Sequence, residues 1–93
     1  MLTLDSVLKI ASGVITRESD DELVVVLPEE GKFFVLNGTG AEVFQLVDGK
    51  RMLNDIAIAL HSRHDDIALD RVQGDVLTFA EKILEKAAVR ILQ

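Results

Sequence analysis

The chain has 93 residues, of which 48% are hydrophobic and 28% charged, a globular composition that we expect to form a single domain over residues 1–93. Acidic residues outnumber basic ones by 16 to 10, and a net charge of −6 disfavours binding to nucleic acid. Cysteine is absent, so disulfides and thiolate sites are excluded. No apolar run reaches the length of about 20 residues that spans a membrane, and a cytoplasmic location is expected.

The first part of the chain favours β-structure. Residues 1–13 carry a spaced apolar set that predicts a docking arm or a short helix, and residues 14–17 predict a short strand. Residues 23–27 are the strongest strand, because β-branched side chains fit a pleated surface. A turn at 28–31 leads to a partner strand at 32–36, so these segments predict a hairpin.

The register of this hairpin makes both faces of the sheet apolar. The expected pairs are Leu27–Lys32, Val25–Phe34 and Leu23–Leu36 on one face and Val26–Phe33 and Val24–Val35 on the other. A sheet that packs on helices along one face is usually polar on the other. Either residues 1–13, the third helix or a dimer partner covers the second face, or this surface and an open strand edge accept a foreign peptide.

Three helices are predicted after the hairpin. Thr39 and Glu42 have the spacing of a capping box, which predicts a helix from there to about residue 47. Apolar residues at helical spacing predict a second helix at about 53–63. The third helix begins near Leu69 and precedes a β-branched tail.

The third helix has an unusually wide apolar face. Its main seam consists of Val72, Val76, Phe79 and Ile83. With Leu77 and Leu84 at its margin, the weakly polar arc reaches about 160°, whereas a surface helix needs about 100° for one core. Either the two margin residues pack under the C-terminal tail, or they form the helix wall of a groove whose other wall is a strand.

No residue pattern indicates catalysis. His61 and His64 share a helix face, but two histidines with nearby aspartates are a weak metal signal, and we interpret them as solvent-exposed residues near a helix C-terminus. The serines lie in no nucleophile motif, and residues 38–40 lack the ending of a phosphate-binding loop. We expect no enzyme activity, no cofactor and no metal.

An ordered set of motifs resembles the PqqD-like family. Residues 34–51, FVLNGTGAEVFQLVDGKR, match its pattern of apolar-Leu-Asn-x-Thr-Gly-Ala, a short helix with an aromatic residue, and Leu-apolar-Asp-Gly-x-Arg. Asp55, Asp75 and Phe79 continue the pattern in register, so the resemblance covers about residues 14–86. It implies an α+β, winged-helix-like fold in which a three-stranded antiparallel sheet is followed by three helices.

The resemblance also implies a function. Members of the family bind the leader segment of a ribosomally made precursor peptide and present it to a modifying enzyme, often a radical SAM enzyme. In relatives the leader adds as an extra strand beside the third strand and rests against the third helix. The residues carried over are Lys32, Phe33, Phe34, Val35 and Leu36 on the strand and Asp75, Leu77, Thr78, Phe79 and Lys82 on the helix.

The chain departs from the family at three places. Val47 replaces a cysteine of members that make pyrroloquinoline quinone, so the quinone pathway is not assigned; Met52 replaces a helix-capping threonine, and Ala87-Ala88 replaces a helix-ending glycine. Two other functions stay open. A winged-helix transcription regulator is disfavoured by the acidic balance and the scattered basic residues. The other is a structural or assembly subunit that buries its sheet in a homodimer.

Overall fold

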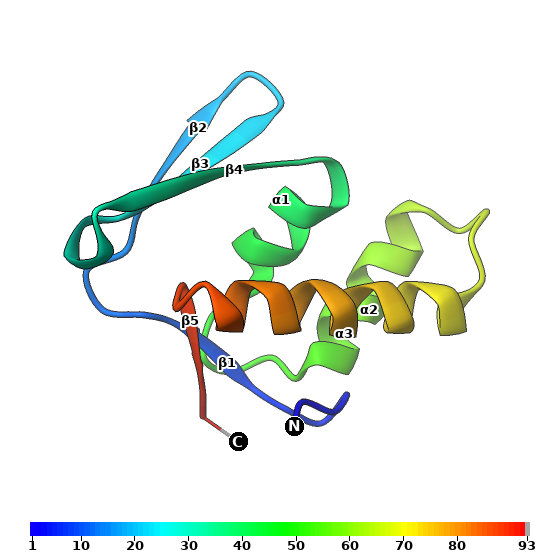
Figure 1. Ribbon diagram of the computed structural model, residues 1–93. Coiled ribbons are helices and arrows are strands. Elements are labelled where there is room, and N and C mark those ends of the chain that lie inside the picture. Colours follow the sequence, from blue (N-terminus) through cyan, green and yellow to red (C-terminus); the bar gives the residue numbers. More distant parts are fainter. Residues whose placement is uncertain (93) are drawn as a thin grey trace.

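The computed structural model describes residues 1–92 and confirms a three-stranded antiparallel sheet followed by three helices (Figure 1). The sheet has the order β2–β3–β4, with β2 at Ile15–Ser19, β3 at Glu22–Leu27 and β4 at Lys32–Asn37. A 3₁₀ turn at Pro28–Glu30 joins β3 to β4. Strands β2 and β4 are therefore the two edges of this sheet.

The predicted hairpin register is confirmed, since Leu27 pairs with Lys32 and Val25 with Phe34. One face of the sheet packs on the helices, with α1 and α3 below it in Figure 1, and Leu23, Val25 and Leu27 are buried there. The alternating burial of β3 follows from the two-residue repeat of a strand.

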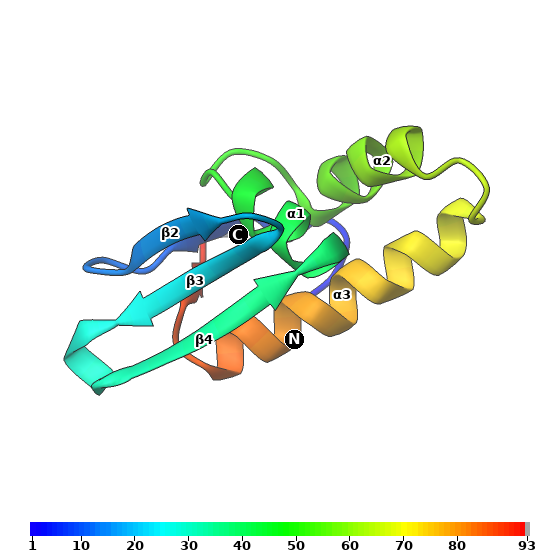
Figure 2. The ribbon, with the colours of Figure 1, turned by 90° about the horizontal axis from the view of Figure 1, so that it is seen from above.

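The second face of the sheet has no cover from residues 1–92. Ile15 is 57% exposed, Phe33 69% and Val35 46%. The expected covers within the chain were wrong: the N-terminal arm, residues 1–13, packs elsewhere, and α3 lies on the opposite face (Figures 1 and 2). A dimer partner stays a prediction.

Helix α1 spans Gly38–Leu46, α2 Leu53–Arg63 and α3 Leu69–Glu85. The predicted starts of α2 and α3 are confirmed. The predicted capping box of Thr39 and Glu42 was wrong. Asn37 is the N-cap residue of α1 and makes no side-chain cap, and Glu42 turns toward the end of α2. Arg63 Nη1 lies 3.1 Å from Glu42 Oε2, and His64 Nε2 lies 3.2 Å from Oε1.

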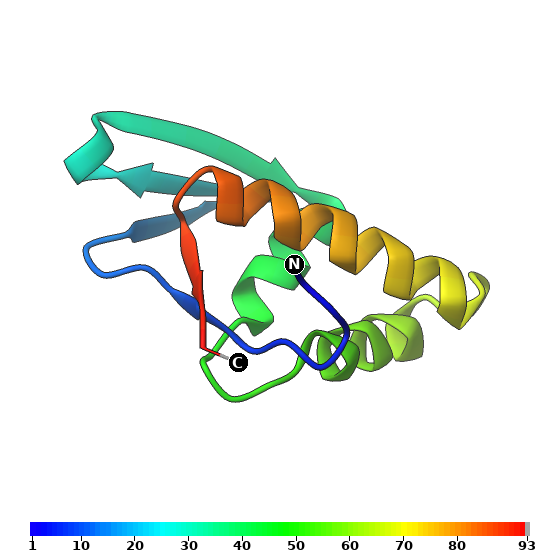
Figure 3. The same ribbon diagram turned by 60° about the horizontal axis from the view of Figure 1, so that its bottom comes forward.

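The N-terminal arm docks on the rest of the chain as an extended segment. Its strand β1, Leu8–Ile10, pairs antiparallel with the tail strand β5, Val89–Ile91, in a second sheet (Figure 3). Leu2 and Leu8 of the arm are buried in the core. The arm is thus part of the fold.

The arm also caps α2, where Met52 stands in place of the family's threonine. Met52 supplies no side-chain cap, but the carbonyls of Ser6 and Leu4 accept the backbone N–H groups of Leu53 and Asn54, both at 2.9 Å. Free donors of a helix start need such partners.

Helix α3 ends in a left-handed turn at Ala87, whose φ is 65°. The N–H of Ala88 donates to Ile83 O and that of Ala87 to Leu84 O, both at 3.0 Å. These two bonds make a Schellman motif, which usually has glycine at the left-handed position. The tail thus turns back toward β1 despite the missing glycine.

No helix within residues 1–92 combines the length and apolarity needed to cross a bilayer.

Candidate functional site

Strand β4 offers an unpaired backbone edge. It pairs with β3 on one side, and no strand among residues 1–92 pairs with it on the other. Strand alternation turns Lys32, Phe34 and Leu36 to the helix side of the sheet and Phe33 and Val35 to the open face. Unpaired N–H and C=O groups of an edge can pair with another extended segment.

Helix α3 runs alongside this edge (Figure 2). Between the start of β4 and the end of α3 lies a hollow of about 480 Å³, lined by Leu27, Glu30, Lys32, Phe33, Phe34, Lys82, Glu85, Lys86 and Ala87. The Nζ of Lys86 lies 5.3 Å from the centre of the Phe34 ring, within cation–π range. The hollow is therefore lined by two phenylalanines and three lysines.

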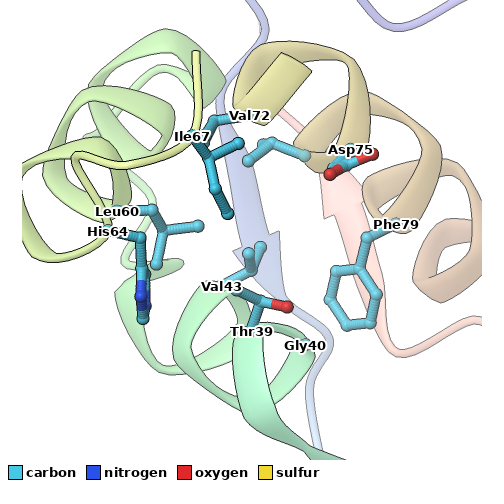
Figure 4. Close-up of a pocket in the computed structure, with 10 residues that line it drawn as sticks. Thr39, Gly40, Val43, Leu60, His64, Ile67, Val72, Asp75 and Phe79 are labelled. Carbon is cyan, nitrogen blue, oxygen red and sulfur yellow. The ribbon is translucent and has the colours of Figure 1, made fainter. Parts of the chain in front are cut away.

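A second cavity, the anchor pocket, has a volume of about 200 Å³ and lies where α3 passes α1 and the end of α2 (Figure 4). Its lining residues are Thr39, Gly40, Val43, Leu60, His64, Ile67, Val72, Asp75, Val76 and Phe79. The walls are mostly apolar, and the Asp75 carboxylate belongs to an exposed residue at its rim. The groove is defined here as this pocket, the hollow and the free edge of β4.

Gly40 allows α1 and α3 to meet closely in the anchor pocket. A Cβ built on Gly40 would lie 3.1 Å from Cε1 of Phe79, tighter than an ordinary contact. The glycine of the LNGTGA motif thus leaves room for the Phe79 ring. No pattern in the sequence predicted this contact between Gly40 and Phe79.

The structure brings most of the expected site residues together. Residues 32–36 form the free edge, and Asp75, Phe79 and Lys82 line the two cavities beside it. Thr78 is exposed one helical turn before Lys82. Lys86 was not among the expected residues, although its spacing of four from Lys82 places it on the same face.

Leu77 is not brought into the groove, which corrects its expected place on the groove wall. At 100° per residue it lies about 160° around α3 from Phe79. It is half-buried against the core on the side of Gln73, whose amide donates to Asn54 Oδ1 at 2.9 Å. This side of α3 faces away from β4.

Leu84 lies on the same side as Leu77. It lines a shallow hollow with Met1 and Leu2, so the N-terminal arm, not the C-terminal tail, packs on this margin of α3 (Figure 3). The wide apolar arc therefore serves two neighbours: the groove side faces β4, and the margin faces the arm.

Charge near the anchor pocket is balanced by a small network. Burial raises the pKa of the Glu42 carboxyl, but hydrogen bonds and positive charge from His64 and Arg63 outweigh burial and lower that pKa. His64 is therefore a partner of Glu42, where sequence reasoning expected a solvent-exposed residue. Within residues 1–92, no group of three or more His, Cys, Asp or Glu side chains is arranged to hold a metal ion.

Known proteins resemble the chain in sequence pattern and in fold. A family model described as coenzyme PQQ synthesis protein D (PqqD) matches residues 22–89. No curated protein matches the chain.

Two solved structures share the fold. One is TbiB1 in complex with the TbiA(beta) leader peptide, with 22% identity and a TM-score of 0.81 over 88% of this chain and 94% of that one. The other is the PqqD truncation of Methylobacterium extorquens PqqCD, described as a stand-alone recognition element for ribosomally synthesized and post-translationally modified peptides. It has 23% identity and a TM-score of 0.80 over 97% of this chain and 95% of that one.

Proposed function

This chain belongs to the coenzyme PQQ synthesis protein D (PqqD) family, and on this premise we propose that it binds the leader segment of a ribosomally made precursor peptide. The observation that carries the proposal is the free edge of β4 beside the groove along α3. Two proteins of the same fold support it, one solved with a leader peptide and one described as a recognition element.

The leader binds as a fourth strand of the sheet. Its backbone pairs with the free edge of β4, which supplies affinity for any extended peptide, and its alternate side chains enter the groove, which supplies selectivity. The remaining side chains lie on the open face beside Phe33 and Val35, whose exposed apolar surface they partly cover. Micromolar affinity is expected from the modest area that a short peptide buries.

The chain acts by tethering and does no bond chemistry itself. A bound leader holds the attached core peptide near a modifying enzyme, which raises the effective concentration of the core. The partner in this proposal is a peptide-modifying enzyme of the radical SAM class, and the location is the cytoplasm. The serines and histidines supply no nucleophile with a matched base.

The test is a titration with the leader of a precursor encoded beside the gene of this chain, followed by amide chemical shifts. We expect shifts in β4, in residues 75–85 of α3 and in Lys86 just after the helix. Phe79→Ala should weaken binding at least tenfold, because the ring lines the anchor pocket. Shifts confined to β1, β5 and α2 would show that the site is wrong.

A second candidate is a homodimer that buries the open face of the sheet. The observation that favours it is the exposure of Ile15, Phe33 and Val35 on one surface. Sedimentation equilibrium of the wild type and of Phe33→Lys distinguishes a homodimer from a monomeric peptide-binding protein. A dimer that Phe33→Lys converts to a monomer supports this candidate, whereas a monomeric wild type excludes it.

A further inference from the structure

The groove is basic at one end. Lys32, Lys82 and Lys86 line the hollow at the start of β4, with Glu30 and Glu85 also present. Within residues 1–92 none of these lysines takes part in a salt bridge. Three lysines against two glutamates give the hollow a net charge of +1 in a chain whose net charge is −6, and the lysine ammonium groups have no carboxylate partner in a salt bridge in the described part of the chain.

The other end of the groove is apolar with an acidic rim. Val43, Leu60 and Val76 form buried walls of the anchor pocket. The carboxylate of Asp75 lies at its margin (Figure 4). A large apolar side chain fits such walls, because its burial is favourable. A carboxylate placed there would meet the like charge of Asp75.

The distances along α3 match the repeat of a strand. A helix rises about 1.5 Å per residue, so Lys82 and Lys86 lie about 7 Å and about 13 Å beyond the middle of the Asp75–Phe79 turn. A strand rises about 3.4 Å per residue and returns to one face every second residue. The second and fourth residues after an anchored residue therefore reach about 7 and 14 Å on the groove side.

The direction follows from the sheet. Strand β4 begins beside Lys82 and Lys86 and ends just before Gly40, which contacts Phe79, so β4 runs antiparallel to α3. All pairs in this sheet are antiparallel, and antiparallel pairing is slightly the more stable kind. A strand added antiparallel to β4 runs with α3 and passes the anchor pocket before the lysines.

We propose that the groove selects a leader segment in which a large apolar residue is followed by acidic residues at the second and fourth positions. This inference rests on the proposed function and adds the chemical class of the peptide. The apolar side chain enters the anchor pocket, and the two carboxylates pair with Lys82 and Lys86. Acidic residues at the first and third positions lie on the open face, away from the lysines.

The probes are three labelled peptides of identical composition. The matched peptide is Ser-Thr-Leu-Thr-Glu-Thr-Glu-Thr-Ser, the shifted one is Ser-Thr-Leu-Glu-Thr-Glu-Thr-Thr-Ser, and the third is the matched sequence reversed. Amide chemical-shift titration gives each dissociation constant and locates the peptide. The matched peptide should bind about tenfold more tightly than the other two, the size expected for two partly exposed charge pairs.

The variants test the charges directly. The double variant Lys82→Glu with Lys86→Glu should lose the preference for the matched peptide. It should instead bind more tightly to a peptide in which both glutamates of the matched sequence are replaced by lysine. Lys9→Glu with Lys50→Glu is the control, because it changes the net charge equally at two exposed residues outside the groove. Circular dichroism checks that both variants are folded.

Failure of this inference differs from failure of the proposed function. Equal affinities for the three peptides, no measurable binding of any, or the same loss of preference in the control variant would overturn the charge pattern. The proposed function survives those results if the leader encoded beside the gene still shifts β4 and α3. It fails if that leader also leaves β4 unperturbed.

Discussion

On one side of α3 the N-terminal arm packs against the helix, whereas on the other side the chain leaves both a strand edge and two cavities open. Leu2 and Leu8 of the arm are buried, and backbone hydrogen bonds tie the arm to α2 and to the tail. On the open side, Phe34 stays partly exposed in the hollow with the lysines, and Phe79 is partly exposed at the anchor pocket. Apolar surface is present on both sides, so what distinguishes the proposed binding side is an unpaired strand edge with cavities beside it.

The largest expected effect tests whether the closed side is part of the core. Leu8 is only 1% exposed, so Leu8→Ala should lower the free energy of unfolding by about 2–5 kcal/mol. Urea unfolding followed by circular dichroism measures it, with Lys82→Ala as a control on the open side that should change it by less than about 0.5 kcal/mol. A loss below about 1 kcal/mol for Leu8→Ala would mean that the arm is only loosely attached.

A second variant separates packing from binding on the two sides. Leu77 is half-buried on the closed side, so Leu77→Ala should cost about 1–2 kcal/mol of stability and leave leader affinity within twofold of wild type. Phe79→Ala should affect both quantities. Fluorescence titration and urea unfolding of the two variants give the contrast, and a strong loss of affinity in Leu77→Ala would return Leu77 to the binding site.

A third variant concerns the turn that sends the tail to the closed side. Ala87 has a left-handed φ of 65°, a conformation that is higher in free energy for a residue with a Cβ than for glycine. Ala87→Gly should raise the free energy of unfolding by about 0.5–1 kcal/mol. Ala88→Gly, at a fully buried neighbour, should lower it instead; equal effects of the two changes would contradict this account of the turn.

The smallest expected effect lies beside the open anchor pocket and depends on pH. The pKa of Glu42 is lowered in the folded chain, so its ionised carboxylate stabilises the fold. This contribution to the free energy of unfolding is complete above the pKa of an unfolded glutamate, about 4.3, and is lost as pH falls through the lower folded pKa. Glu42→Gln should therefore cost a few tenths to about 1 kcal/mol near neutral pH. The unfolding curves of wild type and variant should converge in acid; a constant difference down to pH 2 would exclude the ionic origin.

The sequence by itself determined the hairpin, the span of α2 and the start of α3. The register of β3 and β4 follows from the turn at 28–31 and from side-chain alternation, because a shift by one residue would exchange the two faces. Periodic apolar residues marked the two helices for a similarly local reason. The strand half of the candidate site could be read in the same way.

Only the tertiary structure decided which neighbour each side of α3 meets. Helical periodicity gives the width of an apolar arc but not what packs on either margin, so Leu77 was assigned to the wrong side. Strands β1 and β5 are three residues each and come from opposite ends of the chain. Segments this short carry no local sequence pattern from which their pairing could be predicted. The two partners of Glu42 are Arg63 at the end of α2 and His64 just after it, 21 and 22 residues away. This long-range charge pairing prevails over a local capping box.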